Sequence, residues 1–315
     1  MNGNKTTILI TGGAGFIGSA LVETLIKDTS NFVVVVDNLQ TGSRKKIPKA
    51  THDNLKFIQC DVNHEDQITS VFHTFSFDFV FHYAAMVGVK RTLKNPVRVL
   101  QDIDGIRNVL NLSKNTGVKR IFYSSSSEVY GEPVEYPQNE ETTPLNSRLP
   151  YAIVKNVGEA FLKSYQQEFG LNYTIFRFFN TYGPKQAKDF VISKFLNAAL
   201  NNQDLTIYGN GSQTRTFCFI ENNITACVAA ISSKNCINRT INIGNNKEIS
   251  ILELAELIIK MTGSTSKIKH LPPLEDGDMT RRNPDITIMK ELIKQDLISL
   301  EEGLKKVLQA TTLVV

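Results

Sequence analysis

The sequence has few of the residues that hold metal ions or build disulfide frameworks. Its 315 residues include only four cysteines, and no two of these form a Cys-x-x-Cys pair. No two of its five histidines have the spacing of metal ligands. Secreted domains that depend on disulfides use cysteine densely. We therefore expect no metal site and buried free thiols in a reducing compartment, at Cys60, Cys218, Cys227 and Cys236.

The chain also lacks a long apolar run and a strong charge of one sign. No stretch reaches the length of about 20 apolar residues that crosses a membrane. The N-terminus leads almost directly into an apolar β-branched run, which leaves no room for a signal peptide. The net charge is +4 and the basic residues are scattered, so nucleic-acid binding gains little support. We expect a cytoplasmic protein without a membrane or nucleic-acid partner.

A glycine-rich loop, Thr-Gly-Gly-Ala-Gly-Phe-Ile-Gly at 11–18, is the most informative stretch that is present. An apolar run precedes it, and a segment with apolar residues at helical spacing follows, so the loop joins a strand to a helix. The first glycine permits a tight turn, the second lets a backbone approach a pyrophosphate, and the third lets the helix pack on the strand. The anion would lie at the helix N-terminus, at Gly12, Gly15, Phe16, Ile17 and Gly18.

An acidic residue ends the next strand. The run 32–36 is apolar and Asp37 follows it, about twenty residues beyond the loop, where a carboxylate accepts hydrogen bonds from the adenosine ribose. This carboxylate would repel a 2′-phosphate, and Asn38 supplies no arginine to hold one. We interpret the basic run 44–46 as a solvated loop. The pattern predicts NAD rather than NADP.

Two further strand ends favour the same cofactor. Asp61, with Val62, follows the run 55–60 and can bond the adenine amino group or cap the next helix. The small residues Ala84 and Ala85 follow the run 77–82 and leave space for a ligand. His82 is interpreted as a core histidine rather than a catalyst. The predicted cofactor contacts here are Asn38, Asp61, Val62, Ala84 and Ala85.

Strand and helix signals alternate through the first half of the chain. The expected strands are 7–10, 32–36, 55–60, 77–82, 118–123 and 173–178, and long helices are expected at 95–116 and 151–169. The fold class is α/β: a doubly wound parallel-sheet Rossmann fold with a smaller C-terminal α/β substrate lobe. We expect an NAD-binding domain at 1–178 and a lobe at 179–315, with a shared core.

Tyr151 and Lys155 are four residues apart at the start of a helix and therefore share a face. An ammonium beside a phenol favours the phenolate and lowers its pKa from about 10. Tyr151 could then take a proton from a sugar hydroxyl while hydride leaves the same carbon. Lys155 could also hold the nicotinamide ribose. Ser126 ends the preceding strand, and its hydroxyl could bond the same substrate oxygen.

In this order the glycine loop, Asp37, Ser126, the Tyr151/Lys155 pair and the Asn-Thr-Tyr-Gly-Pro run at 180–184 resemble a known family. It is the NAD-dependent nucleotide-sugar epimerase/dehydratase family of extended short-chain dehydrogenase/reductases, and the resemblance covers nearly the whole chain. It implies a tightly held NAD, oxidation at C4 of a hexose ring of a nucleotide-diphosphate sugar, and a homodimer packed through helices near 97–116 and 151–169.

The resemblance also implies contacts to the substrate. Asn180 is similar to the residue that bonds the diphosphate, and the loop 205–215 is similar to the one that covers the base and phosphates. Arg215 and Arg282 would bind phosphate oxygens, since a fork of donors suits them; the alternative for either is a solvated surface charge. The implied substrate contacts are Lys90, Arg91, Asn180, Lys194, Tyr208, Gln213, Arg215 and Arg282.

The fate of the 4-keto sugar depends on Glu128. Sugar 4,6-dehydratases carry Thr-Asp-Glu where this chain has Ser-Ser-Glu at 126–128, so the aspartate that helps expel the C6 hydroxyl is absent. UDP-glucuronate decarboxylases carry Thr-Ser-Glu and also resemble the chain at 282–285. The segment 85–92 looks more like the 4-epimerases. We expect a 4-epimerase in which Glu128 positions the sugar. The alternatives are release of a 4-keto hexose or heptose, possibly GDP-linked, a decarboxylase, a 4,6-dehydratase, or a non-catalytic NAD sensor.

Overall fold

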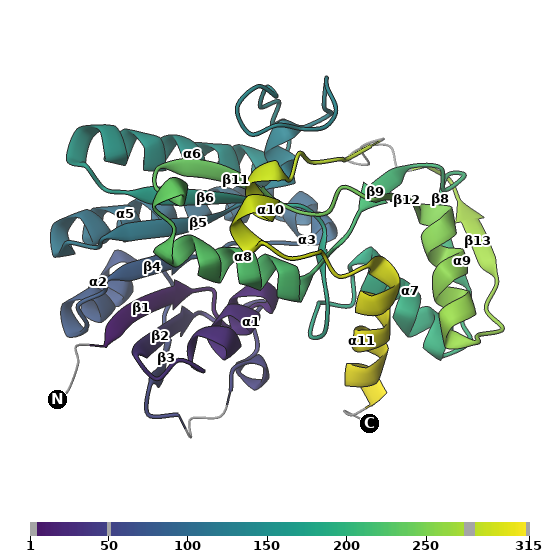
Figure 1. The fold of residues 1–315 in the computed structure, drawn as a ribbon, viewed down its shortest axis with the longest axis horizontal. Coiled ribbons are helices and arrows are strands. Elements are labelled where there is room, and N and C mark those ends of the chain that lie inside the picture. Colours follow the sequence, from purple (N-terminus) through teal and green to yellow (C-terminus); the bar gives the residue numbers. More distant parts are fainter. Residues whose placement is uncertain (1–4, 49–51, 274–280, 313–315) are drawn as a thin grey trace.

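A parallel sheet forms the centre of the molecule. The computed structural model describes residues 5–48, 52–273 and 281–312, without the side chains of Val89, Lys90, Thr311 and Thr312. Within these ranges, seven parallel strands lie in the order β11-β6-β5-β4-β1-β2-β3 (Figure 1). Their bounds are β1 Thr6–Thr11, β2 Asn31–Asp37, β3 Leu55–Gln59, β4 Phe79–His82, β5 Arg120–Ser126, β6 Tyr173–Phe178 and β11 Arg239–Ile243.

Helices cover both faces of this sheet. In β2, Val33 and Val35 belong to a core on one face, and Val34 and Val36 belong to a core on the other. This continuous β-branched run is typical of a strand buried on both sides. The first face packs against α1 Phe16–Leu25, α8 Ile220–Ser232 and α10 Thr287–Ile293. The second packs against α2 Glu65–Thr74, α5 Asp102–Thr116 and α6 Pro150–Phe169.

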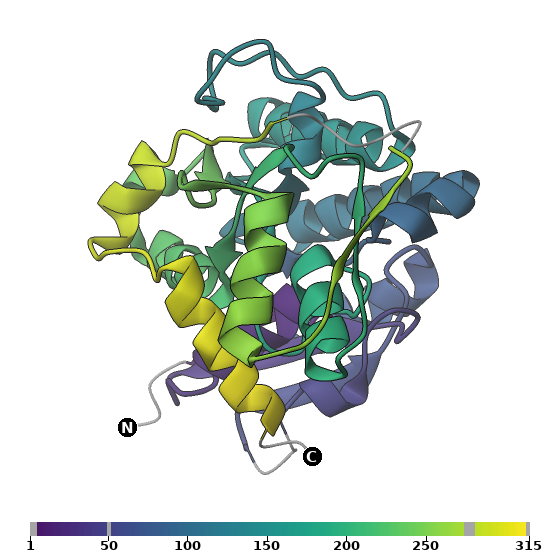
Figure 2. The same cartoon turned by 90° about the vertical axis from the view of Figure 1, so that its right-hand side faces the viewer.

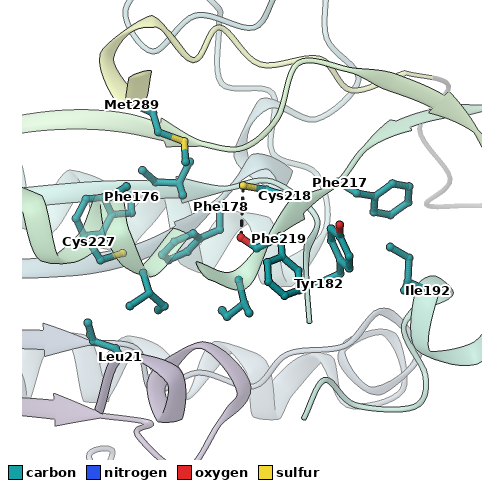
Figure 3. Packing of buried hydrophobic residues seen from close by; sticks show 14 of the residues in the cluster. Leu21, Phe176, Phe178, Tyr182, Ile192, Phe217, Cys218, Phe219, Cys227 and Met289 are labelled. Atoms are coloured by element: carbon teal, nitrogen blue, oxygen red, sulfur yellow. Dashed lines mark hydrogen bonds between the residues drawn. The ribbon is translucent and has the colours of Figure 1, made fainter. Parts of the chain in front are cut away.

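Figure 3 shows part of the first core. Phe176 and Phe178 of β6 lie between Met289 of α10 on one side and Leu21 of α1 on the other, with Cys227 of α8 beside them. All four cysteines are buried and free, as the sequence predicted. The described residues contain no cluster of three or more His, Cys, Asp or Glu side chains suited to a metal ion.

The second lobe lies beyond the carboxyl ends of the strands, at the right of Figure 1 and facing the viewer in Figure 2. Strand β8, Leu205–Tyr208, pairs in parallel with β13, Ile268–Leu271. Strand β9, Thr214–Thr216, pairs antiparallel with β12, Glu248–Ser250. Two short strands, β7 Thr181–Tyr182 and β10 Cys218–Phe219, pair with each other. The other elements of the lobe are α7 Val191–Leu200, α9 Ile251–Thr262 and α11 Leu300–Thr312.

The Rossmann-type sheet confirms the predicted fold class, whereas one helix differs from the prediction. The helix expected over 95–116 is two segments, α4 Pro96–Leu100 and α5, joined at Gln101, whose backbone keeps helical angles. A further short helix, α3 Val89–Lys94, precedes them. Among the described residues, none of the helices combines the length and the apolar character needed to span a bilayer.

The strand order reverses at β1, which lies between β4 and β2. In open α/β sheets a ligand crevice forms at such a switch point, outside the carboxyl ends of the strands. The loops after β1, β2, β4 and β5 all reach this edge, so the topology brings the predicted site residues together.

Candidate active site

A cavity of about 610 Å³ runs along the carboxyl ends of the strands, between the sheet and the second lobe. All the predicted cofactor contacts from the first four strands line it, as do all four predicted catalytic residues. These residues are Gly12, Gly15, Phe16, Ile17, Gly18, Asp37, Asn38, Asp61, Val62, Ala84, Ala85, Ser126, Glu128, Tyr151 and Lys155.

The glycine loop forms a cradle that side chains would fill. Gly12 has a φ of +68°, and a Cβ on it would lie 2.6 Å from the backbone nitrogen of Ala84. A Cβ on Gly18 would lie 2.4 Å from the carbonyl oxygen of Gly12. Helix α1 begins directly after Gly15, so the free amides of its first turn point out of the loop. This arrangement suits the pyrophosphate of a dinucleotide.

Asp37 is buried at the far end of the cavity. Its Oδ2 accepts a hydrogen bond from the Ala14 amide at 2.9 Å, and its Oδ1 accepts one from the Leu39 amide at 2.8 Å. Burial raises the pKa of this carboxyl, against the effect of both bonds. A Cβ on Gly42 would lie 2.7 Å from Oδ1. The two hydrogen bonds therefore hold the carboxylate in one orientation. The space beside it is open because residue 42 is a glycine and has no side chain.

The basic run at 44–46 is not wholly the solvated loop that we expected. Arg44 and Lys45 are exposed, but Lys46 is half-buried and lines the cavity. Burial lowers the pKa of Lys46, while the Asp37 charge opposes this. The structure therefore places one cation in the cavity lining near Asp37, where the sequence pattern indicated none.

Replacing Asp37 by alanine is expected to weaken NAD binding by about 10- to 100-fold, because a hydrogen bond to a charged group contributes about 1.5–3 kcal/mol. The preference for NAD over NADP should narrow as well, since the charge that repels a 2′-phosphate is lost. Titration of NAD-free protein with each dinucleotide measures both effects. Equal binding of NAD and NADP by the unmodified protein would contradict this role, and Asp53→Ala, at an exposed position, is the control.

Asp61 does not cap α2, one of the two roles that the sequence left open, because the N-cap residue is His64 and no side chain bonds there. The contact of Asp61 to adenine remains a prediction. Asp61 Oδ1 accepts a hydrogen bond from the Asn63 amide at 3.0 Å, in the turn before α2. Its Oδ2 accepts one from Asn38 Nδ2 at 2.8 Å, at the wall of the cavity. The carboxylate thus closes a turn and also ties together the loops after β2 and β3.

The predicted catalytic residues lie where β5 ends and α6 begins. We call Ser126, Glu128, Tyr151 and Lys155 the catalytic cluster. Lys155 Nζ donates to the carbonyl oxygen of Ser124 at 2.6 Å. The Ser126 side chain interacts with the Tyr151 hydroxyl, and Ser126 Oγ accepts a hydrogen bond from the Glu128 amide at 3.2 Å. Burial lowers the pKa of Lys155 to about 8, and the charge of Asp102 opposes the shift.

The expectation that Lys155 lowers the pKa of Tyr151 is wrong for the protein groups alone. Burial raises the pKa of Tyr151 well above its ordinary value, against the hydrogen bond from Ser126. Lys155 Nζ lies 5.8 Å from the centroid of the Tyr151 ring and is engaged with Ser124. The phenol is therefore held in its neutral form, and further positive charge in the cavity is needed to favour the phenolate.

The Arg282 side chain contacts the catalytic cluster and is largely shielded from solvent. Its Nη2 donates to Glu128 Oε1 at 2.6 Å, and its Nη1 donates to Ser127 Oγ at 3.3 Å. The guanidinium is 8% exposed and the carboxylate 19%. Two residues that the sequence assigned to different tasks, phosphate binding and sugar positioning, thus form one ion pair at the cavity wall.

The other predicted substrate contacts fall into two groups. Arg91 and Asn180 line the cavity with Arg282. In the second lobe, Lys194 Nζ donates to Thr206 Oγ1 at 2.7 Å and lies 5.7 Å from the Tyr208 ring centroid. Beside them, Gln213 Nε2 donates to the Tyr208 carbonyl and Arg215 Nη1 to the Thr214 carbonyl. The described cavity lining includes none of Lys194, Tyr208, Gln213 or Arg215, and the Lys90 side chain lies outside the described residues.

Sequence reasoning missed Asp102, at the start of α5. Asp102 lines the cavity, and its Oδ2 accepts a hydrogen bond from the Met86 amide at 2.7 Å. Burial raises the pKa of this carboxyl, and its charge acts on Lys155. No motif in the sequence marks it. His82 is a core residue, as interpreted: Nδ1 shares a 2.9 Å hydrogen bond with Thr11 Oγ1, and burial lowers its pKa to about 3.

Comparisons with known proteins identify the family to which this sequence is similar. The sequence profile described as "NAD dependent epimerase/dehydratase family" matches residues 8–244. A UDP-N-acetyl-alpha-D-glucosaminuronate decarboxylase of Bacillus cytotoxicus is 38% identical over 97% of this chain and 97% of its own.

Two solved structures are similar over the whole fold. One is a UDP-N-acetylglucosamine 4-epimerase from Methanobrevibacter ruminantium in complex with UDP-N-acetylmuramic acid: TM-score 0.91, 32% identity, 99% of this chain and 100% of that one. The other is a UDP-glucuronic acid 4-epimerase from Bacillus cereus in complex with UDP-glucuronic acid and NAD: TM-score 0.89, 28% identity, 98% and 100%.

Proposed function

The chain belongs to the NAD-dependent epimerase/dehydratase family, whose members act on nucleotide sugars, and we propose that it is a nucleotide-sugar 4-epimerase. Its cofactor is NAD. It would oxidise C4 of the sugar ring and return hydride to the opposite face of the same carbon. The sugar is carried on a nucleoside diphosphate, as in the relatives crystallised with UDP-sugars.

The observation that supports C4 oxidation is the meeting of Ser126, Tyr151 and Lys155 in one cavity with the glycine cradle. When bound, NAD supplies the hydride acceptor and a positively charged ring. Tyr151 would take the proton of the C4 hydroxyl, and Ser126 would orient that oxygen by a hydrogen bond. Lys155 is anchored by the Ser124 carbonyl and would hold the nicotinamide ribose. A non-catalytic NAD sensor would need none of these hydroxyl groups.

The pairing of Glu128 with Arg282 favours epimerisation over dehydration. A 4,6-dehydratase needs a free carboxylate to remove the C5 proton and a neighbouring acid to expel the C6 hydroxyl. Here a guanidinium 2.6 Å away engages the Glu128 carboxylate, so this carboxylate is already paired, and residue 127 is a serine. Glu128 would therefore position the sugar rather than accept a proton.

Decarboxylation of a hexuronate is the second candidate, and Arg282 is the observation that favours it. A cation beside Ser127 and Glu128 could hold a substrate carboxylate near C5. Once C4 is a ketone, that carboxylate is β to it and can leave as carbon dioxide. The relative from Bacillus cytotoxicus is named as a decarboxylase of this substrate type.

Turnover of UDP-, GDP- and dTDP-sugars in D₂O, followed by mass spectrometry and NMR, separates these outcomes. We expect a 4-epimer of unchanged mass with no deuterium at C5. Loss of carbon dioxide from a UDP-hexuronate would favour the decarboxylase, and loss of two hydrogens would indicate release of a 4-keto sugar. Deuterium at C5 in a product lighter by one water would make the protein a dehydratase. Absence of NADH formation with every sugar would favour the sensor.

The homodimer implied by the family resemblance remains a prediction. The helices expected to form it expose Val97, Leu100, Ile153 and Phe169. Apolar side chains of this size are suited to an interface between two copies of the chain.

A further inference from the structure

A buried ion pair lies directly behind the catalytic cluster. Glu159 on α6 and Arg177 on β6 are 1% and 2% exposed. Arg177 Nε donates to Glu159 Oε1 at 2.9 Å, and Nη2 donates to Oε2 at 2.7 Å. Neither residue lines the cavity. The proposed C4 chemistry therefore gives this pair no direct task.

The pair contacts the serine segment at the end of β5. Ser125 Oγ donates to Glu159 Oε1 at 2.6 Å, and Ser125 is also the register partner of Arg177 in the sheet. Ser125 lies between Ser124, whose carbonyl oxygen accepts a hydrogen bond from Lys155, and Ser126, whose side chain interacts with the Tyr151 hydroxyl. A fixed Ser125 therefore fixes the backbone that presents both neighbouring groups.

The same pair fixes the helix that carries the base. Glu159 comes four residues after Lys155 and eight after Tyr151 on α6, so the three share one face of the helix. The two parallel bonds to Arg177 thus tie α6 to β6 one turn beyond Lys155. Rotation or sliding of α6 would break these bonds before it moved the Tyr151 hydroxyl far from Ser126.

Arg177 also reaches the segment that carries Glu128. Its Nη1 donates to Tyr130 Oη at 2.8 Å, and Tyr130 Oη in turn donates to Asn242 Oδ1 at 2.8 Å. Tyr130 ends the 3₁₀ turn Ser127–Tyr130, in which Glu128 lies. The Arg177 guanidinium therefore contacts α6, which carries Tyr151, through Glu159. It also contacts the 3₁₀ turn that carries Glu128, through Tyr130.

Stability alone is a weak reason for such a pair. Both charges lose their hydration, and an apolar pair of similar volume often stabilises a fold as well or better. What a forked, two-bond contact adds is direction, because guanidinium and carboxylate must stay coplanar. We propose that Glu159 and Arg177 are positioning residues that hold the Tyr151 hydroxyl against Ser126. The role in catalysis depends on the proposed function.

The test compares two conservative changes of buried arginines. Arg177→Lys keeps the charge and loses the fork. Arg120→Lys is the matched control, because Arg120 is also buried but lies at the amino end of β5 and donates to the Ala230 carbonyl. We expect Arg177→Lys to lower kcat by up to about 100-fold with little change in KM, since small misplacements of reacting groups have such effects. Arg120→Lys should lower the melting temperature and leave kcat unchanged.

A second variant removes both charges and so leaves no buried charge unpaired. In the crystal structure of Glu159→Met/Arg177→Met, we expect the Tyr151 and Ser126 hydroxyls to lie farther apart than in the unmodified protein. This measurement needs no turnover, so it tests positioning even if the unmodified protein converts no sugar and the proposed function fails. An unchanged Tyr151–Ser126 contact with unchanged kcat would overturn the proposal. Equal losses of kcat in Arg177→Lys and Arg120→Lys would overturn it as well.

Discussion

Tyr151→Phe should slow hydride transfer by about 10²–10⁴-fold, the usual contribution of a general acid–base group. The change removes one oxygen from a partly buried ring that packs against the core, so the fold and NAD binding should persist. Ser126 would lose its partner at the place where the C4 oxygen is expected. Single-turnover reduction of bound NAD, followed by absorbance after mixing with a substrate from the sugar panel, measures the effect.

Tyr165→Phe is the matched control for this experiment. Tyr165 lies on the same helix, and its hydroxyl donates to Asn111 Oδ1 at 2.6 Å, away from the cavity lining. Its loss removes the same atom from α6 without touching the catalytic cluster, and hydride transfer should stay normal. A Tyr151→Phe protein with near-normal single-turnover reduction would show that another group is the base.

The second large effect concerns the dependence of stability on pH. Burial lowers the pKa of Lys155 from 10.5 to about 8. Between these two values the unfolded chain binds a proton that the folded NAD-free protein has released, so the free energy of unfolding rises with pH. Below about pH 8, Lys155 is protonated in both states and the cost of burying its charge is fully present.

This pKa shift predicts that the free energies of unfolding of wild type and Lys155→Met depend differently on pH. From pH 7 to pH 10 the difference in unfolding free energy should change by about 2.5 kcal/mol in favour of the wild type. Urea unfolding of both NAD-free proteins across that range provides the measurement, and other titrating groups cancel in the difference. Lys163→Met, at an exposed position of the same helix, controls for the loss of one positive charge. Parallel curves for wild type and Lys155→Met would show that Lys155 titrates normally.

Much of the fold could be predicted because the local preference of a segment for strand or helix agrees with its burial in the final structure. The run Val33–Val36 is β-branched throughout, and the sheet buries it on both faces. The glycine loop joins β1 to α1 as its spacing indicated. Since parallel strands end at one edge, residues at strand ends such as Asp37 and Ser126 were expected to share a site, and they line one cavity.

The parts that the sequence did not predict depend on packing between distant segments. Glu128 and Arg282 are 154 residues apart, and their pairing is visible only in three dimensions. The pKa of Tyr151 depends on how completely the fold buries the phenol, which spacing along a helix cannot show. Asp102 enters the site because α4 and α5 bring it to the Met86 amide, a contact that leaves no local sequence pattern.

The return of the chain to the central sheet has a consequence for recombination between relatives. Strand β11 pairs with β6 along its length, and α8 and α10 complete one face of the sheet, although all three follow residue 178. A chimera joined there would exchange the substrate lobe together with an edge strand and two core helices of the cofactor half. Grafts intended to alter sugar preference should instead replace the excursions from 179 to 219 and from 244 to 285, leaving α8, β11 and α10 with the sheet they support.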